Sequence, residues 1–156
     1  MIRAKRIQHV VLKVTNLDAS IRFYEQILGL KVVVRSEERG AAFLSFGTDH
    51  HNLALFQRAT GLPPEDNQPG LNHMGWQLED YDALKAAYTE LTDKGIEVNR
   101  TTQHNITNSI YVKDPDGVLI ELFCDRFEDG YNVMKTMGPR TDNLDILTGE
   151  VTPEKT

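Results

Sequence analysis

The chain has 156 residues, 40% hydrophobic and 26% charged, a composition typical of a globular protein with one domain's worth of core. Its formal net charge of −6, with lysine and arginine scattered, disfavours nucleic acid and anionic membranes as partners. A single cysteine, Cys124, excludes an internal disulfide and is typical of a reducing compartment. Since we find neither a signal peptide pattern nor an apolar run of about 18 residues, we expect a cytoplasmic protein.

The first half of the chain predicts a β-α-β-β-β unit. Residues 7–15 are rich in β-branched side chains and indicate a strand. Asn16 follows as a helix cap, and apolar residues at helical spacing predict a helix that ends at Gly29. Further strands are expected at residues 31–35, 41–46 and 52–57.

The second half predicts the same order after a linker. Residues 58–70 carry three prolines and two glycines, which favours a connecting segment. A strand at 71–78 and a helix at 81–94 follow, with Gly95 as the stop. Strands are then expected at 97–100, 107–113 and 118–123, the last two joined by the tight turn Asp114-Pro115-Asp116-Gly117.

The residues from 126 onward become polar and predict little regular structure. We expect one helix near residues 131–137 and loose chain after about residue 148. Residues 137–142 are either a plain surface tail, the interpretation we favour, or a segment packed over a cavity mouth.

An internal repeat relates the two halves at a fixed offset of 64 residues. One supersecondary unit is therefore built twice, and strand pairing between two such units forms a curved mixed sheet with a concave cavity. We expect an α+β fold with one domain over residues 1–125, made of modules 5–57 and 70–125, and a C-terminal extension over 126–156. Within the segments 9–24 and 73–88, four positions are identical: His9/His73, Asp18/Asp82, Ala19/Ala83 and Tyr24/Tyr88.

The repeated histidines are candidate metal ligands. His9 and His73 each begin a predicted strand, so a pseudo-twofold axis can bring the two imidazoles together. Glu121 lies among apolar residues in the last strand, where a carboxylate is costly unless it faces solvent, a partner charge or a metal. Two histidines and one carboxylate form open iron(II) sites, and the same ligand types suit Zn²⁺ or Mn²⁺.

At these motifs the chain resembles the vicinal oxygen chelate superfamily, which includes glyoxalase I, bleomycin-resistance proteins and type I extradiol dioxygenases. The resemblance covers residues 7–123 and implies that fold, a homodimer, and a metal on His9, His73 and Glu121. It is carried by His9-Val-Val-Leu-Lys-Val, Phe23-Tyr24-Glu25-Gln26-Ile27-Leu28-Gly29-Leu30, Leu71-Asn72-His73-Met74-Gly75 and Asp114-Pro115-Asp116-Gly117-Val118-Leu119-Ile120-Glu121.

The first copy differs from glyoxalase I at one position. Aligning residues 52–56 with 119–123 puts Ala54 opposite Glu121, whereas glyoxalase I carries a ligating glutamate in the first copy as well. Extradiol dioxygenases have three protein ligands and leave the opposite side of the iron open. The resemblance therefore favours Fe²⁺, with Mn²⁺, Zn²⁺, Ni²⁺ or Co²⁺ as alternatives.

Three further residues match catalytic positions of extradiol dioxygenases. Asp49-His50-His51-Asn52-Leu53-Ala54-Leu55 is similar to a stretch with a histidine that lines the oxygen pocket. We assign that role to His51, with His50 as the alternative. His104 matches a histidine that acts as acid and base. Tyr111, ten residues before Glu121, matches a tyrosine that hydrogen-bonds the substrate.

Together these matches imply a dioxygenase of aromatic catabolism. It would bind iron and open the ring of a catechol-type diol with O₂, without nucleic acid or membrane partners. One alternative is another metal-dependent enzyme of the superfamily, such as a glyoxalase, lyase or epimerase. The other is a metal-free binding protein like the bleomycin-resistance proteins, against which the complete ligand set counts.

Overall fold

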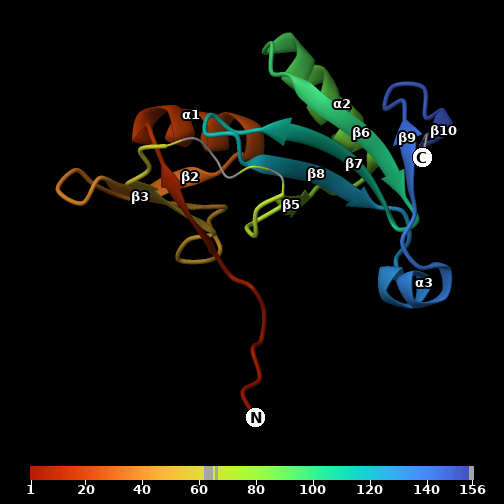
Figure 1. Cartoon of the computed structure of the whole chain (residues 1–156), viewed down its shortest axis with the longest axis horizontal. Helices are drawn as coiled ribbons and strands as arrows, with labels where there is room; N and C mark the ends of the chain where they lie inside the picture. The colour runs from red at the N-terminus through yellow and green to blue at the C-terminus, as the bar shows by residue number, and fades with distance from the viewer. Residues whose placement is uncertain (62–64, 66, 155–156) are drawn as a thin grey trace. The chain divides into compact units, whose positions relative to one another are not determined.

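The computed structural model describes residues 1–61, 65 and 67–154, and the chain divides into two compact units (Figure 1). Unit 1 comprises residues 1–65 and 114–117, and unit 2 comprises residues 66–113 and 118–156. Hydrogen bonding groups the described strands into two mixed sheets, one in each unit. This confirms the α+β class and the two-module order. The expected single sheet, formed by strand pairing between the modules, is replaced among the described strands by two sheets, each formed within one unit. The predicted linker falls partly on residues 62–64 and 66, which lie outside the described residues.

Unit 1 has the predicted β-α-β-β-β order. Its sheet is ordered β1-β4-β3-β2, with β1 parallel to β4 and the other neighbours antiparallel. The Asn16 side chain accepts a hydrogen bond from the Ala19 N–H, and Gly29 ends the helix at a φ of 68°. The elements are β1 (Val10–Val14), α1 (Leu17–Leu28), β2 (Lys31–Ser36), β3 (Ala41–Ser45) and β4 (Leu53–Gln57).

The 114–117 turn belongs to unit 1, although it lies between two strands of unit 2 in the sequence. The buried Tyr24 hydroxyl donates to Asp114 at 2.8 Å, and the Thr15 N–H donates to Asp116 at 3.1 Å. Burial and the Asp114 carboxylate raise the pKa of Tyr24 far above its ordinary value, so the phenol stays a donor. A buried hydroxyl without such an acceptor would destabilise the fold, and this pair therefore anchors α1.

Unit 2 repeats the order and then extends it. Its sheet is ordered β10-β9-β6-β7-β8-β5, with β5 parallel to β8 and the other neighbours antiparallel. Helix α2 is capped by Asp80 and packs on β7 and β8. The elements are β5 (His73–Gln77), α2 (Tyr81–Asp93), β6 (Val98–His104), β7 (Thr107–Lys113), β8 (Leu119–Asp125), α3 (Gly130–Met137), β9 (Thr141–Leu144) and β10 (Val151–Pro153).

Two predictions about the C-terminal extension are wrong for the described residues: that residues 137–142 are a plain surface tail, and that the chain is loose after about residue 148. After the expected helix α3, β9 adds to the sheet beside β6, and β10 pairs with β9 (Figure 1). Leu144 and Ile146 are 3% and 2% exposed. Strand β6 also continues through His104 rather than ending at Arg100, because β9 pairs with its second half. The β9 sequence, Thr-Asp-Asn-Leu, lacks the apolar alternation that would identify a strand.

The first and last strands of each module have the same register. Val11 pairs with Ala54 in unit 1, and Gly75 pairs with Glu121 in unit 2. Because Val11 and Gly75 are equivalent at the offset of 64 residues, Ala54 and Glu121 occupy matching positions. The predicted alignment of Ala54 with Glu121 is therefore confirmed.

Each unit has its own apolar core. In unit 1, Leu30, Leu44 and Leu55 are fully buried. In unit 2, the exposed fractions of Leu84 and Leu122 are 0% and 1%. Burying each such side chain stabilises the fold by about 1.5–3 kcal/mol. No helix in the described part of the chain is long and apolar enough to cross a membrane.

Candidate functional site

Unit 2 contains a cavity of about 440 Å³, and four of the predicted site residues line it. They come from four neighbouring strands: His73 from β5, Glu121 from β8, Tyr111 from β7 and His104 from β6. Their side chains share one region because the strands are adjacent in the sheet order β6-β7-β8-β5. The rest of the wall is largely apolar with two arginines: Arg100, Asn105, Ile106, Thr107, Phe123, Met134, Gly138, Pro139, Arg140 and Thr141.

Glu121 is the common partner of the other three residues. The Tyr111 hydroxyl donates to its Oε1 at 2.7 Å, and His73 Nε2 lies 3.2 Å from its Oε2. His104 Nε2 lies 4.0 Å from Oε1. The carboxylate side chain is 12% exposed, so its charge lies in a largely dehydrated environment where these polar partners are required.

Gly75 makes room for this carboxylate, a role that the sequence prediction missed. A Cβ atom at position 75 would lie 3.2 Å from Glu121 Oε2 and 3.3 Å from the Phe123 ring. Both distances are shorter than ordinary carbon contacts. The difference between the two copies could have indicated this role, because the first copy has Val11 where the second has Gly75.

The orientation of His73 suits a metal ligand. Its Nδ1 lies 2.6 Å from the Asn72 side-chain oxygen, which can only accept, so we assign the proton to Nδ1. The unprotonated Nε2 then faces Glu121 Oε2, and a nitrogen lone pair and a carboxylate oxygen point to one place. Such a nitrogen and oxygen pair, with the histidine held through its other nitrogen, fits a first-row divalent metal. Asn72 was not predicted.

Unit 1 contributes a second group, formed by three histidines. The rings of His9 and His51 are 4.4 Å apart between centroids, and His50 is 6.1 Å from His9. His51 also packs edge-on against Phe43 at 5.3 Å and is half-buried, whereas His50 is exposed. Burial, together with the neighbouring imidazoles His9 and His50, lowers the pKa of His51 and favours its neutral form. Of the two adjacent histidines, His51 therefore has the more ordered environment.

The predicted metal ligands divide between the units. His9 belongs to unit 1, and His73 and Glu121 belong to unit 2. Among the described residues, no three His, Cys, Asp or Glu side chains form a ready metal-binding group. The geometry within unit 2 thus supports the donor pair His73 and Glu121, and the three-ligand site remains a prediction.

Tyr111 is held as a neutral donor. It is 2% exposed, and the Arg100 guanidinium carbon lies 4.2 Å from its ring centroid. Burial, followed by the hydrogen bond to Glu121, raises the pKa of Tyr111 to about 12. The phenol therefore keeps its proton at neutral pH and can donate it in a hydrogen bond.

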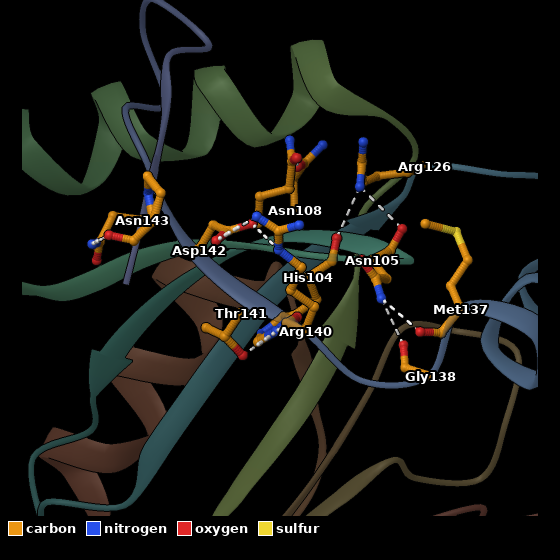
Figure 2. Close-up of polar contacts among 12 residues, drawn as sticks. His104, Asn105, Asn108, Arg126, Met137, Gly138, Arg140, Thr141, Asp142 and Asn143 are labelled. Atoms are coloured by element: carbon orange, nitrogen blue, oxygen red, sulfur yellow. Dashed lines mark hydrogen bonds and ion pairs between the residues drawn. The ribbon is translucent and has the colours of Figure 1, made fainter. Parts of the chain in front are cut away.

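His104 links Tyr111 to the C-terminal strand. Its Nε2 lies 3.1 Å from the Tyr111 hydroxyl, and its Nδ1 lies 3.0 Å from Thr141 Oγ1. Figure 2 shows His104 beside Thr141 and Arg140. The sequence indicated His104 only through the family resemblance. It named Arg140 and Thr141 only within the segment 137–142, and the less favoured interpretation, packing at the cavity, is the one that the structure supports.

Comparison with protein families and curated proteins places these residues in context. Residues 6–122 match the model of the Glyoxalase/Bleomycin resistance protein/Dioxygenase superfamily. The chain is 37% identical over 124 residues to biphenyl-2,3-diol 1,2-dioxygenase 3 of Rhodococcus globerulus, which covers 78% of this chain and 64% of that protein. The chain thus spans less than two thirds of this relative's length. A probable lactoylglutathione lyase of Vibrio parahaemolyticus is 31% identical over 126 residues, covering 75% of this chain and 88% of that protein.

A solved structure supports the fold independently. The crystal structure of a glyoxylase/bleomycin resistance protein/dioxygenase domain from Frankia sp. matches with a TM-score of 0.66. The match covers 83% of this chain and 99% of that one at 22% sequence identity. At this level of identity the likeness concerns the backbone arrangement.

Proposed function

The chain belongs to the Glyoxalase/Bleomycin resistance protein/Dioxygenase superfamily, and from this premise we propose that it is an extradiol dioxygenase. The substrate would be a small catechol-type aromatic diol, and the co-substrate O₂. The observation that carries the proposal is the convergence of His73, Tyr111 and His104 on Glu121 in one cavity, while the matching position of the first module is Ala54. The name of the Rhodococcus globerulus relative, a biphenyl-2,3-diol 1,2-dioxygenase, agrees with it.

We further propose that Fe²⁺ binds to His73 and Glu121, with His9 as the third ligand. A bound iron(II) ion would hold both diol oxygens and activate O₂ through its open positions. Mn²⁺, Zn²⁺, Ni²⁺ and Co²⁺ use the same donor types and remain alternatives. The site geometry that supports this proposal is the His73 Nε2 to Glu121 Oε2 distance of 3.2 Å.

The other cavity residues would act on the substrate directly. Tyr111 would donate a hydrogen bond to a diol oxygen, since its raised pKa keeps the phenol neutral. His104 would take a proton from the diol and return it to the product, since it lies in the cavity with Nε2 facing the other site residues. His51 would line the space for O₂. The apolar wall formed by Ile106, Phe123, Met134 and Pro139 suits an aromatic ring and excludes water.

Direct assay tests this function. The protein is purified anaerobically, loaded with Fe²⁺, and mixed in air with catechol, 3-methylcatechol and 2,3-dihydroxybiphenyl. We expect O₂ uptake together with a yellow ring-opened product. Both should vanish in His73→Ala and persist in Gln77→Ala, an exposed position on the same strand. Absence of O₂ uptake with every diol of a broad panel would refute the proposal.

The alternative within the family is a lyase or isomerase that uses a different metal. The similarity to a probable lactoylglutathione lyase of Vibrio parahaemolyticus supports this alternative. The alanine at position 54, where glyoxalase I carries a ligating glutamate, counts against it. Conversion of the methylglyoxal–glutathione adduct by protein loaded with Ni²⁺ or Zn²⁺, without O₂ uptake on diols, would select this alternative. Failure to bind any of these metals would instead favour a metal-free binding protein. The cytoplasmic location and the homodimer are proposed from the sequence alone.

A further inference from the structure

The segment after residue 122 lies outside the family match, yet it builds part of the cavity. Strand β9 runs antiparallel to β6, with Thr141 directly opposite His104. Gly138, Pro139, Arg140 and Thr141 all line the cavity. A part of the chain that the family domain does not include therefore contacts a predicted catalytic side chain.

The contacts of this segment select one orientation of the His104 ring. Nδ1 lies 3.2 Å from the Arg140 carbonyl oxygen and 3.0 Å from Thr141 Oγ1 (Figure 2). A carbonyl oxygen can only accept, so we assign the proton to Nδ1, shared between this carbonyl and the nearer Thr141 oxygen; removal of the Thr141 hydroxyl therefore weakens the preference for this tautomer. The other nitrogen, Nε2, then lies 3.1 Å from the Tyr111 oxygen and 3.2 Å from Thr102 Oγ1. Because the Tyr111 hydroxyl donates its proton to Glu121, the Thr102 hydroxyl is the group that can donate to Nε2. The His104 side chain is 26% exposed, and both of its ring nitrogens have protein partners.

The backbone on both sides of His104 is held in place. The Asn105 side-chain amide donates to the Gly138 carbonyl at 2.7 Å, and Arg126 Nη1 donates to the carbonyls of His104 and Asn105, each at 3.0 Å (Figure 2). Further along the strand, Thr101 Oγ1 donates to the Leu144 carbonyl at 2.5 Å. The C-terminal segment is therefore attached to β6 at several points, of which one involves the His104 ring.

We propose that Thr141, together with the Arg140 carbonyl, is a positioning residue for His104. It holds the imidazole as the Nδ1–H tautomer and directs the lone pair of Nε2 toward Thr102, Tyr111 and the cavity. This inference rests on the proposed function, because it gives His104 a proton-transfer role in ring cleavage. The tautomer itself follows from the contacts of unit 2. Holding a histidine through one nitrogen so that the other can exchange a proton is a general way to prepare a base.

The experiment combines spectroscopy with matched variants. Long-range proton–nitrogen correlation spectra are recorded on protein saturated with Zn²⁺, which is diamagnetic, and His104→Gln assigns the His104 signals. Three variants are compared with the wild-type chain. Thr141→Val removes the hydroxyl at nearly constant volume, and Thr141→Ser keeps it. Thr101→Val removes a hydrogen bond between β6 and β9 that does not touch His104.

We expect the Nδ1–H pattern for His104 in the wild type, in Thr141→Ser and in Thr101→Val, and a mixture of tautomers in Thr141→Val. With Fe²⁺ and a diol, kcat of Thr141→Val should fall about threefold to tenfold at unchanged KM, the equivalent of one hydrogen bond. Thr141→Ser should restore it. An Nε2–H pattern in the wild type, or equal effects of Thr101→Val and Thr141→Val, would overturn the positioning role. If the Nδ1–H pattern and its dependence on Thr141 hold but no diol is cleaved, the proposed function fails and the positioning contact stands.

Discussion

The two modules share one backbone plan but carry different chemistry. In both, the first strand runs parallel to the last, and the second strand has an irregular register at the same place, between Val32 and Val34 and between Val98 and Arg100. Yet the pair Val11 and Ala54 of unit 1 is replaced by Gly75 and Glu121 in unit 2. The two modules thus differ at both positions of one strand pair. In unit 1 this pair is apolar, and in unit 2 it contains a carboxylate with three polar partners.

The modules also differ at the edge of their sheets. Strand β2 is the last strand of the unit 1 sheet, and Val33 and Val34 are 55% and 53% exposed. The equivalent strand β6 is covered by β9, which provides the contacts of His104. The unit 2 cavity therefore depends on an added strand as much as on the repeated module.

The largest expected effect comes from transferring the carboxylate to unit 1. Ala54 is 1% exposed and Val11 occupies the position that Gly75 leaves open, so Ala54→Glu should lower the free energy of unfolding by about 3 kcal/mol. The double variant Val11→Gly/Ala54→Glu should recover part of this loss. Urea denaturation measures both, and equal stability of the single and double variants would contradict the role given to the glycine.

A smaller effect is expected at the repeated tyrosine. Tyr24→Phe removes the hydroxyl that donates to Asp114 and should lower the free energy of unfolding by about 1–3 kcal/mol. Tyr88→Phe, at the equivalent position of α2, is the matched control and should cost less, because Tyr88 is only half-buried. Thermal unfolding of both variants checks the order. A larger loss for Tyr88→Phe would show that the 114–117 turn is not an anchor for α1.

The smallest expected effect concerns the space beside Glu121. Gly75→Ala should displace the carboxylate or the Phe123 ring by a few tenths of an ångström and weaken Fe²⁺ binding about tenfold. Stability should change by only about 1 kcal/mol. Val11→Ala, the equivalent position of unit 1, is the control and should leave Fe²⁺ affinity unchanged. Metal titration measures both variants, and wild-type affinity in Gly75→Ala would show that the close contact is unimportant.

Much of the fold was predictable because it depends on local signals. The cap at Asn16, the stop at Gly29 and the turn at 114–117 are recognisable from residue type, and α1 and β7 have the expected bounds. Strand β9 was not predictable, since its polar sequence is a strand only because β6 offers an open edge. The residues of the candidate site also divide into those with a local sequence signal and those without one. Glu121 was recognised as a carboxylate in an apolar strand, but Asn72 and Thr141 have no such local signal.

The sequence alone determined the repeat and, with it, the β-α-β-β-β order of elements along each module and the matching of Ala54 with Glu121, because periodicity is a property of residue order. The family was indicated by the resemblance of four motifs. Only the tertiary structure decided which nitrogen of His73 faces Glu121, that Gly75 provides the space, and that the C-terminal strand holds His104. These depend on distances between side chains far apart in the chain, such as His104 and Thr141, and no local pattern of residues encodes such distances.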